Sequence, residues 1–274
     1  MSIKSQITEK LLLLVLDGCR YDTAVEQMGI LNHHVDYKQA QLIKVHAEMP
    51  SSSRPLYEVL ATGVPSYRNG ILTNADGQHS KELSIFDLVK AAGGSTAAAA
   101  HYWQSELFNQ APYEIKRDRI QHDHKKSIQH GIFYSENQYP DSHVFSDGHY
   151  LLHTYQPNLL LIHSMNIDAA GHRYTAVSKE YRKAVNQADQ LIGLYLHDWL
   201  AAGYQVIVTA DHGMDEYGLH GGSMAAHREV PLYIFSDIFP PDCGIEKMNQ
   251  LELAPLICSL LKIDTSERMQ IGRS

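Results

Sequence analysis

The sequence predicts an α/β fold with a doubly wound, mostly parallel sheet, helices on both faces and a small cap insertion. Two observations predict it: short apolar runs alternate with segments of helical periodicity, and 274 residues are enough to bury one large core. Runs of this kind are typical of strands buried on both faces of a parallel sheet. They span residues 11–16, 42–46, 95–100, 159–163, 205–209 and 232–235.

Three segments between or after these runs carry helical periodicity, at residues 84–92, 178–201 and 248–262. The second is the longest, and its apolar side chains recur on one face. They are Tyr181, Ala184, Val185, Ala188, Leu191, Ile192 and Tyr195. Gly203 follows as a C-cap. Strands that alternate with such helices are typical of a parallel, doubly wound sheet.

The segment at about 101–150 breaks this alternation, because it is rich in His, Tyr, Gln, Ser and charged residues. No Pro/Gly/Ser-rich linker separates it from the rest. We therefore expect residues 1–274 to form a single domain with a cap-like insertion at about 101–150, lying over the sheet.

Composition narrows the class of protein. A formal net charge of -8 argues against binding to a nucleic-acid polymer, which depends on clustered Lys and Arg. The one basic stretch, residues 116–126, is interrupted by Asp118 and Asp123, so it is either a solvated face or a local rim that attracts phosphate. The apolar run at 11–16 is far shorter than the roughly 20 residues that span a bilayer. We expect no membrane partner and no signal peptide.

The number and spacing of the cysteines indicate the compartment of the protein. Cys19, Cys243 and Cys258 are odd in number and widely separated, so they define neither a disulfide framework nor a Cys-type zinc site. A reducing compartment fits best, and we expect a cytoplasmic protein.

Chemistry is expected where the strands end, because open parallel sheets bind ligands at the carboxyl ends of their strands. Four strand exits carry residues that bind metals or act as nucleophiles. They are Asp17; the run Ser51, Ser52 and Ser53; Asp168 with His172; and Asp211 with His212. Singly, each has a structural alternative: Asp17 as a helix cap, and Asp211 with His212 as a hydrogen-bonded loop pair. Their coincidence at four exits favours a site.

The ligand types indicate which metal to expect. Asp168 and His172 are separated by one helical turn, and Gly171 between them allows close backbone approach. Carboxylates mixed with imidazoles suit Zn²⁺ first and Mn²⁺ second, rather than Ca²⁺. The number of ligands implies two ions, which could together clamp the attacking and leaving oxygens of a displacement at phosphorus.

The serine run is followed by Arg54 and Pro55, and proline at the first helical position places the serines at a helix N-terminus. The unpaired N–H groups and the helix dipole favour an oxyanion and an incoming phosphate there. The alternative is a serine that only caps the helix.

These motifs together resemble the alkaline phosphatase superfamily, and in particular its type I phosphodiesterase/nucleotide pyrophosphatase branch, over nearly the whole chain. Residues 49–71 are similar to its nucleophile segment, in which the nucleophile lies nine residues before the Thr of a Thr-Gly pair, and counting back from Thr62 gives Ser53. DAAGH at 168–172 matches its Asp-x-x-Gly-His motif, and TADHGM at 209–214 its Asp-His-Gly-Met motif. The tail at 253–274 resembles its closing helix and turn.

The resemblance implies a role for each matching residue. One metal would be bound by Asp17, Ser53, Asp211 and His212, and the other by Asp168, His172 and a third histidine. That histidine would be His220 in a Leu-His-Gly triplet, with His227 as the alternative and otherwise as an outer histidine.

The expected function is a two-metal hydrolase of small phosphate esters, similar to phosphodiesterases and nucleotide pyrophosphatases and acting through a phospho-serine at Ser53. Arg54 is expected to bind substrate. The alternatives are a phosphomonoesterase or phosphomutase of the same superfamily, then a sulfatase or a metal-binding protein without turnover. A sulfatase ranks low because Tyr57 stands where its pattern has arginine, and no Cys occupies the nucleophile position.

Overall fold

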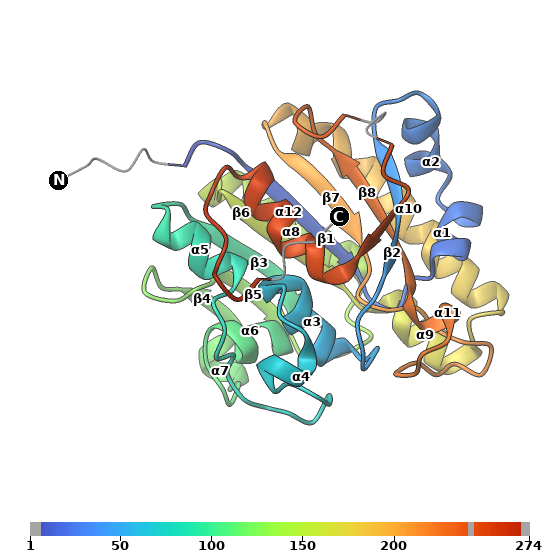
Figure 1. Cartoon of the computed structure of the whole chain (residues 1–274), viewed down its shortest axis with the longest axis horizontal. Coiled ribbons are helices and arrows are strands. Elements are labelled where there is room, and N and C mark those ends of the chain that lie inside the picture. Colours follow the sequence, from blue (N-terminus) through green and yellow to red (C-terminus); the bar gives the residue numbers. More distant parts are fainter. Residues whose placement is uncertain (1–6, 241–243, 270–274) are drawn as a thin grey trace.

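A single sheet organises the chain. The computed structural model describes residues 7–240 and 244–269. Within them, nine strands pair in the order β4-β5-β3-β6-β1-β7-β8-β2-β9 (Figure 1). The strands are β1 (Leu11–Leu16), β2 (Gln41–His46), β3 (Thr96–His101), β4 (Ile120–His122), β5 (His130–Tyr134), β6 (Leu159–Ser164), β7 (Gln205–Thr209), β8 (Glu229–Phe235) and β9 (Lys247–Asn249).

The centre of the sheet is parallel. β1 pairs in parallel with β6 on one side and with β7 on the other, and every residue of Leu11–Leu16 is buried. A continuous apolar run is what a strand covered on both faces requires. β8 runs antiparallel to both β7 and β2, and β4 runs antiparallel to β5. The prediction of a mostly parallel α/β sheet is confirmed.

Helices form two layers that sandwich the sheet. Figure 1 shows α3, α5 and α12 in front of it and α8 and α10 behind it. One layer contains α3 (Ser53–Thr62), α4 (Ser66–Asn69), α5 (Ile85–Ala91), α6 (Tyr102–Phe108) and α12 (Leu253–Leu260); the other contains α1 (Tyr21–Gln27), α2 (Gly29–Asp36), α8 (Asp141–Tyr155), α9 (Asn166–Tyr174) and α10 (Lys179–Ala201). Short helices α7 (Ile115–Asp118) and α11 (Ala225–Arg228) lie in connections. None of the described helices is long and apolar enough to cross a membrane.

Two of the three predicted helices have the expected bounds, because a serine caps each. Ser84 accepts the backbone N–H of Asp87 at the start of α5, and Ser178 accepts that of Tyr181 at the start of α10. The prediction of a helix over 248–262 is wrong at its start. Lys247–Asn249 forms strand β9 beside β2, and a short 3₁₀ turn, Gln250–Glu252, precedes α12. Residues 270–274 of the tail lie outside the described residues.

The segment at 101–150, expected as a cap-like insertion over the sheet, contributes directly to the sheet. β5 pairs in parallel with β3, and β4 pairs with β5 at the edge. Its remaining residues form α6, α7 and the first part of α8. Two strands of this segment therefore belong to the main sheet.

Candidate metal centre

Three neighbouring parallel strands bring the predicted acidic residues to one edge of the sheet. Asp17 follows β1, Asp168 lies in the first turn of α9 directly after β6, and Asp211 follows β7. Because β6, β1 and β7 are adjacent and point the same way, their carboxyl ends meet. The backbone of Gly18 shows how close they are: it has a φ of +73°, and a Cβ there would lie 3.0 Å from the Asp168 Cα.

One group of ligand-type side chains consists of Asp17, Asp211 and His212, whose ligand atoms all lie within 4.8 Å of one another. All three residues are fully buried. The His212 Nε2 atom lies 3.5 Å from Asp17 Oδ1 and 3.3 Å from Asp211 Oδ2. Neither of those carboxylate oxygens has a hydrogen-bond partner among the described residues. Unpaired buried carboxylate oxygens are costly, and a divalent cation would satisfy both.

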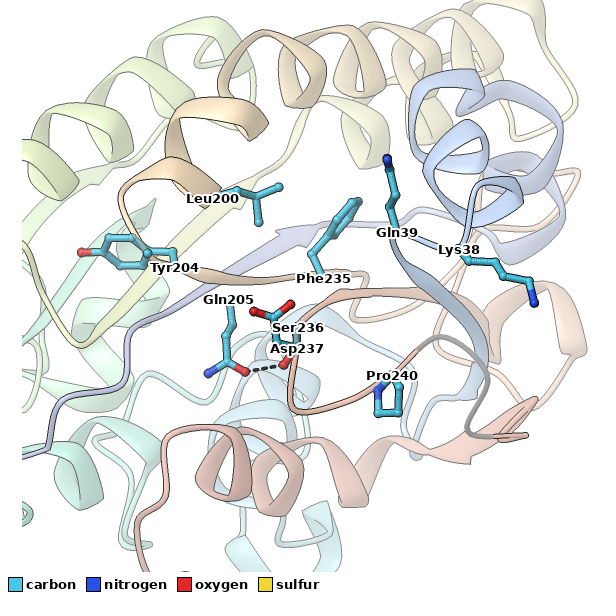
Figure 2. A pocket seen from close by; sticks show the side chains of 10 residues that line it. Lys38, Gln39, Leu200, Tyr204, Gln205, Phe235, Ser236, Asp237 and Pro240 are labelled. Atoms are coloured by element: carbon cyan, nitrogen blue, oxygen red, sulfur yellow. Dashed lines mark hydrogen bonds between the residues drawn. The ribbon is translucent and has the colours of Figure 1, made fainter.

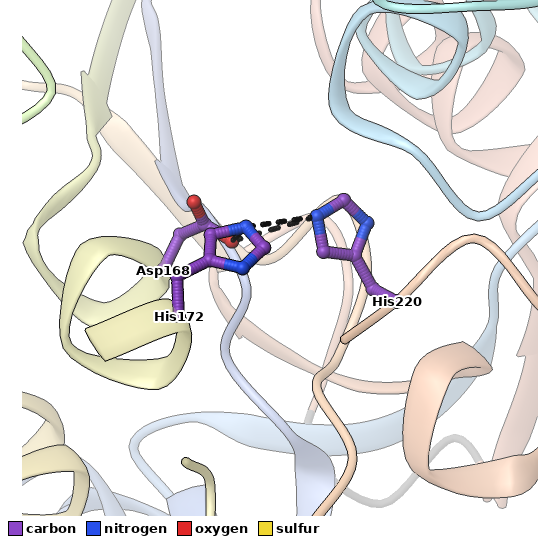
Figure 3. Close-up of side chains that lie close together, drawn as sticks. All are labelled: Asp168, His172 and His220. Carbon is purple, nitrogen blue, oxygen red and sulfur yellow. Dashed lines mark hydrogen bonds and ion pairs between the residues drawn. The ribbon is translucent and has the colours of Figure 1, made fainter. Parts of the chain in front are cut away.

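A second group consists of Asp168, His172 and His220, which meet the same distance limit (Figure 3). Asp168 and His172 project from α9 one turn apart, and His220 comes from the loop after β7. Asp168 Oδ1 lies 3.4 Å from His172 Nε2 and 3.8 Å from His220 Nε2, and it too has no hydrogen-bond partner in the described chain.

Backbone carbonyl groups fix the tautomer of the three histidines. In each, Nδ1 lies within hydrogen-bond distance of a carbonyl oxygen: Gly218 for His172 (2.8 Å), Gly213 for His212 (2.9 Å) and Ser51 for His220 (2.9 Å). A carbonyl can only accept, so Nδ1 carries the hydrogen and Nε2 presents a lone pair. Metal-binding histidines are held in this way, with the second ring nitrogen donating to a fixed partner.

This tautomer makes the distance between His172 and His220 informative. Their Nε2 atoms lie 3.2 Å apart. Two lone pairs at that distance repel each other, whereas two nitrogens bound tetrahedrally to one Zn²⁺ at about 2.0–2.1 Å lie roughly 3.3 Å apart. The residues present therefore fit a cation.

The carboxylates respond to burial and to one another. Burial and the negative charges of Asp17 and Asp211 raise the pKa of Asp168 well above its usual range. Burial and the charge of Asp17 do the same to the pKa of Asp211. Burial also acts to raise the pKa of Asp17, but hydrogen bonds from His163 and Tyr57 and the nearby His212 imidazole outweigh it, so that pKa is low. Crowding of this kind favours a cation among the three.

Ser53 lies at the start of α3, beside the first group. Its Oγ atom is 3.0 Å from His212 Nε2, and the residue is buried. α3 begins at Ser53, so Pro55 is its third residue. The prediction that Pro55 occupies the first helical position is therefore wrong. The consequence for Ser53 is unchanged, because the whole first turn of a helix has N–H groups without intrahelical partners.

His227 belongs to neither ligand group and contacts Gly222 and Asp215 instead. Its Nδ1 accepts the backbone N–H of Gly222 at 3.0 Å, so its Nε2 carries the hydrogen and donates to Asp215 Oδ2 at 3.1 Å. Both ring nitrogens are thus occupied. His220, rather than His227, joins Asp168 and His172.

The sequence model of type I phosphodiesterase/nucleotide pyrophosphatase matches residues 11–220, which include every residue of both groups. The chain belongs to this family.

Curated relatives of this phosphodiesterase-family chain include GPI ethanolamine phosphate transferase 3 of Schizosaccharomyces pombe, which is 23% identical over 93% of this chain and 28% of its own length. Human ectonucleotide pyrophosphatase/phosphodiesterase family member 7 is 34% identical over 26% of this chain and 16% of its own length. The chain spans less than a third of the length of the curated relatives it matches.

Solved structures share the fold. Murine ectonucleotide pyrophosphatase/phosphodiesterase 5 superposes with a TM-score of 0.77 at 13% identity, over 97% of this chain and 98% of that chain. The C-terminal periplasmic domain of EcEptC from Escherichia coli superposes with a TM-score of 0.70 at 9% identity, over 98% and 89% of the two chains. At these identities the likeness shows a common architecture.

Arg54, which is predicted to bind substrate, is buried and already paired with other residues of the chain. It forms an ion pair with Glu106, donates to the Asp76 carbonyl at 2.8 Å, and its guanidinium carbon lies 4.8 Å from the centre of the Trp103 ring. The pairing with Glu106 neutralises its charge. Its role in substrate binding stays a prediction.

Sequence reasoning missed three residues around the centre. Tyr57 and His163 both contact Asp17, and Asn74 Oδ1 accepts the backbone N–H of Arg54 at 3.0 Å, beside the serine. Tyr57 could have been found, because it lies one turn after Ser53 on a helix. His163 and Asn74 had no comparable signal in the sequence.

A surface hollow of about 610 Å³ lies elsewhere in the chain. Figure 2 shows Tyr204 and Gln205, at the amino end of β7, and Phe235, at the carboxyl end of β8, among the residues that line it. Because β8 is antiparallel to β7, this is the sheet edge opposite the metal groups. The hollow is therefore separate from the candidate centre.

Proposed function

We propose that this chain is a two-metal phosphoric ester hydrolase, similar to phosphodiesterases and nucleotide pyrophosphatases, that acts through a phospho-serine at Ser53. One observation carries the proposal: a buried serine hydroxyl at a helix N-terminus lies 3.0 Å from a histidine of a ligand group, with a second ligand group beside it. The family match supports phosphoester chemistry.

Each ligand group would hold one ion in this proposal. Asp17, Ser53, Asp211 and His212 would bind the first, and Asp168, His172 and His220 the second. Mixed imidazole and carboxylate ligands favour Zn²⁺, with Mn²⁺ as the second choice. When bound, such a pair supplies Lewis acidity at the phosphoryl oxygens and lowers the pKa of a coordinated hydroxyl or water.

In this proposal, residues of the chain position the phosphate ester and carry out the substitution at phosphorus. Ser53 Oγ forms a bond to phosphorus as the bond to the first alcohol oxygen breaks, and that alcohol departs. The N–H groups and the dipole of α3 favour both the serine oxyanion and the phosphoryl group. Water then cleaves the phospho-serine, which releases the second product and restores Ser53. Ser53 is buried, so its hydroxyl group is held beside the two ligand groups.

A transferase is the second candidate, because several curated relatives are named GPI ethanolamine phosphate transferases. The first half-reaction would be the same, and an alcohol would replace water in the second. The phosphomonoesterase and phosphomutase alternatives differ likewise in substrate or acceptor.

We propose a small-molecule ester as substrate. We also propose a cytoplasmic location, and the buried free thiols of Cys19 and Cys258 support this location.

The test is the fate of the phosphoryl group. Purified protein loaded with Zn²⁺ or Mn²⁺ is incubated with bis-p-nitrophenyl phosphate, with and without an excess of glycerol as an alcohol acceptor. We expect p-nitrophenyl phosphate and p-nitrophenol in equal amounts, independent of acceptor. Transfer to the alcohol in preference to water would favour the transferase, and an absence of turnover with both metals would overturn the proposal.

A further inference from the structure

The two oxygens of Asp17 lie in different surroundings. Asp17 Oδ2 accepts hydrogen bonds from the Tyr57 hydroxyl and from His163 Nε2, the latter at 3.2 Å. Asp17 Oδ1, which faces His212, has no hydrogen-bond partner in the described part of the chain. The carboxylate is thus anchored on one side and free on the side of the ligand group.

The direction of both hydrogen bonds is fixed by the surroundings. The backbone N–H of His101 donates to His163 Nδ1 at 3.4 Å, so the ring hydrogen of His163 lies on Nε2 and points to Asp17. An ionised carboxylate oxygen can only accept, so the Tyr57 hydroxyl donates to Asp17 Oδ2.

Tyr57 and His163 also support each other. Their rings meet edge to face with centroids 4.6 Å apart, and both residues are fully buried. Tyr57 lies on α3 one turn after Ser53, whereas His163 lies in β6 immediately before the exit that carries Asp168. The pair therefore connects Asp17 to the helix of the serine and to the strand of the second ligand group.

We propose that Tyr57 and His163 are positioning residues that hold Asp17 Oδ2, so that Oδ1 is presented to the first metal ion. The inference rests on the proposed two-metal function. It assigns to Tyr57 a task beyond packing: two donors lower the cost of a buried carboxylate and restrict its rotation before metal binds.

The test measures metal affinity rather than turnover. Metal-free wild type and Tyr57→Phe are titrated with Zn²⁺ against a chromophoric chelator, which gives the stoichiometry and both dissociation constants. Phe keeps the ring and removes the donor. We expect two ions in the wild type, and in Tyr57→Phe a weakening of one ion by about 10–100-fold, the usual effect of losing an outer partner of a ligand. The second ion should be unchanged.

Tyr181→Phe is the matched control, because the buried Tyr181 hydroxyl donates to the Gly18 carbonyl at 2.6 Å, next to Asp17 but not to its carboxylate. It should lower stability without changing either zinc constant. If Tyr57→Phe fails to fold, His163→Gln against His163→Leu repeats the test, since only Gln retains a donor.

The outcomes separate the two proposals. Two ions in the wild type with the same two constants in Tyr57→Phe would overturn the positioning role alone. A wild type that binds no ion would overturn the two-metal function and this inference with it.

Discussion

The imidazole rings of His212 and His220 stack, with centroids 3.8 Å apart and planes inclined by 14°. One ring belongs to the ligand group with Asp17 and the other to the group with Asp168. Because ligands of the two groups are in contact, the two ions would lie close together. Two-metal phosphoryl-transfer sites have ions about 3.5–4 Å apart, so that one ion can stabilise the attacking oxygen and the other the leaving oxygen.

Ser53→Ala should abolish turnover while the fold and most of the bound metal remain. In the proposed mechanism Ser53 would be one metal ligand among several, but it would supply the atom that bonds to phosphorus. We expect kcat to fall by about a thousandfold or more, a scale typical of losing a nucleophile. Release of p-nitrophenol and metal content are measured together. Ser52→Ala is the control, because Ser52 makes no side-chain cap bond to α3; near-normal turnover in Ser53→Ala would refute the nucleophile assignment.

His220→Ala should remove about one equivalent of metal, whereas His227→Ala should not. The Nε2 lone pair of His220 faces the second group, but both nitrogens of His227 are engaged by Gly222 and Asp215. Metal content after gel filtration decides the point. His227→Ala should instead lower thermal stability, since it removes the donor to Asp215 Oδ2 and the acceptor of the Gly222 N–H. Loss of metal only in His227→Ala would reverse the assignment.

Phosphodiesters, and phosphonate monoesters of equal charge, should be cleaved better than phosphomonoesters. A monoester dianion needs additional cationic donors, and the guanidinium next to Ser53, that of Arg54, is already paired with Glu106. We compare kcat/KM for bis-p-nitrophenyl phosphate and p-nitrophenyl phosphate at matched metal and pH. A clear preference for the monoester would contradict this expectation and make Arg54 a substrate ligand.

Glu58 should make stability depend on pH. Burial raises its pKa from an ordinary value of 4.5 to about 8, although the Ser80 hydroxyl bound to it opposes the shift. The folded state therefore retains a proton that the unfolded state loses. This stabilisation is complete below about pH 4.5 and is lost as pH rises through about 8, with a slope near 1.4 kcal/mol per pH unit between them.

The neutral variant Glu58→Gln lacks this titration. The unfolding free energy of wild type relative to Glu58→Gln should fall between pH 5 and 8, measured by urea denaturation of the metal-free proteins. A constant difference over that range would show that Glu58 is ionised in the folded protein.

The sequence by itself determined the six strands β1, β2, β3, β6, β7 and β8 and the residues at the exits that carry the candidate site. Runs such as residues 11–16 have one stable place, in a parallel sheet covered on both faces, and the polar residue that follows must then lie at its carboxyl edge. Asp17, Asp168 and Asp211 could be recognised for this reason. Helices α5 and α10 could be bounded because local serine caps define their starts.

Tertiary structure decided what depends on partners distant in sequence. Residues 247–249 carry a helical pattern, but pairing with β2 makes them a strand. The sequence alone does not distinguish His220 from His227. Their tertiary contacts do, since His220 meets the Ser51 carbonyl and His227 meets Asp215. Tyr57 and His163 meet at Asp17 because α3 and β6 pack around the end of β1, a contact that no local pattern encodes.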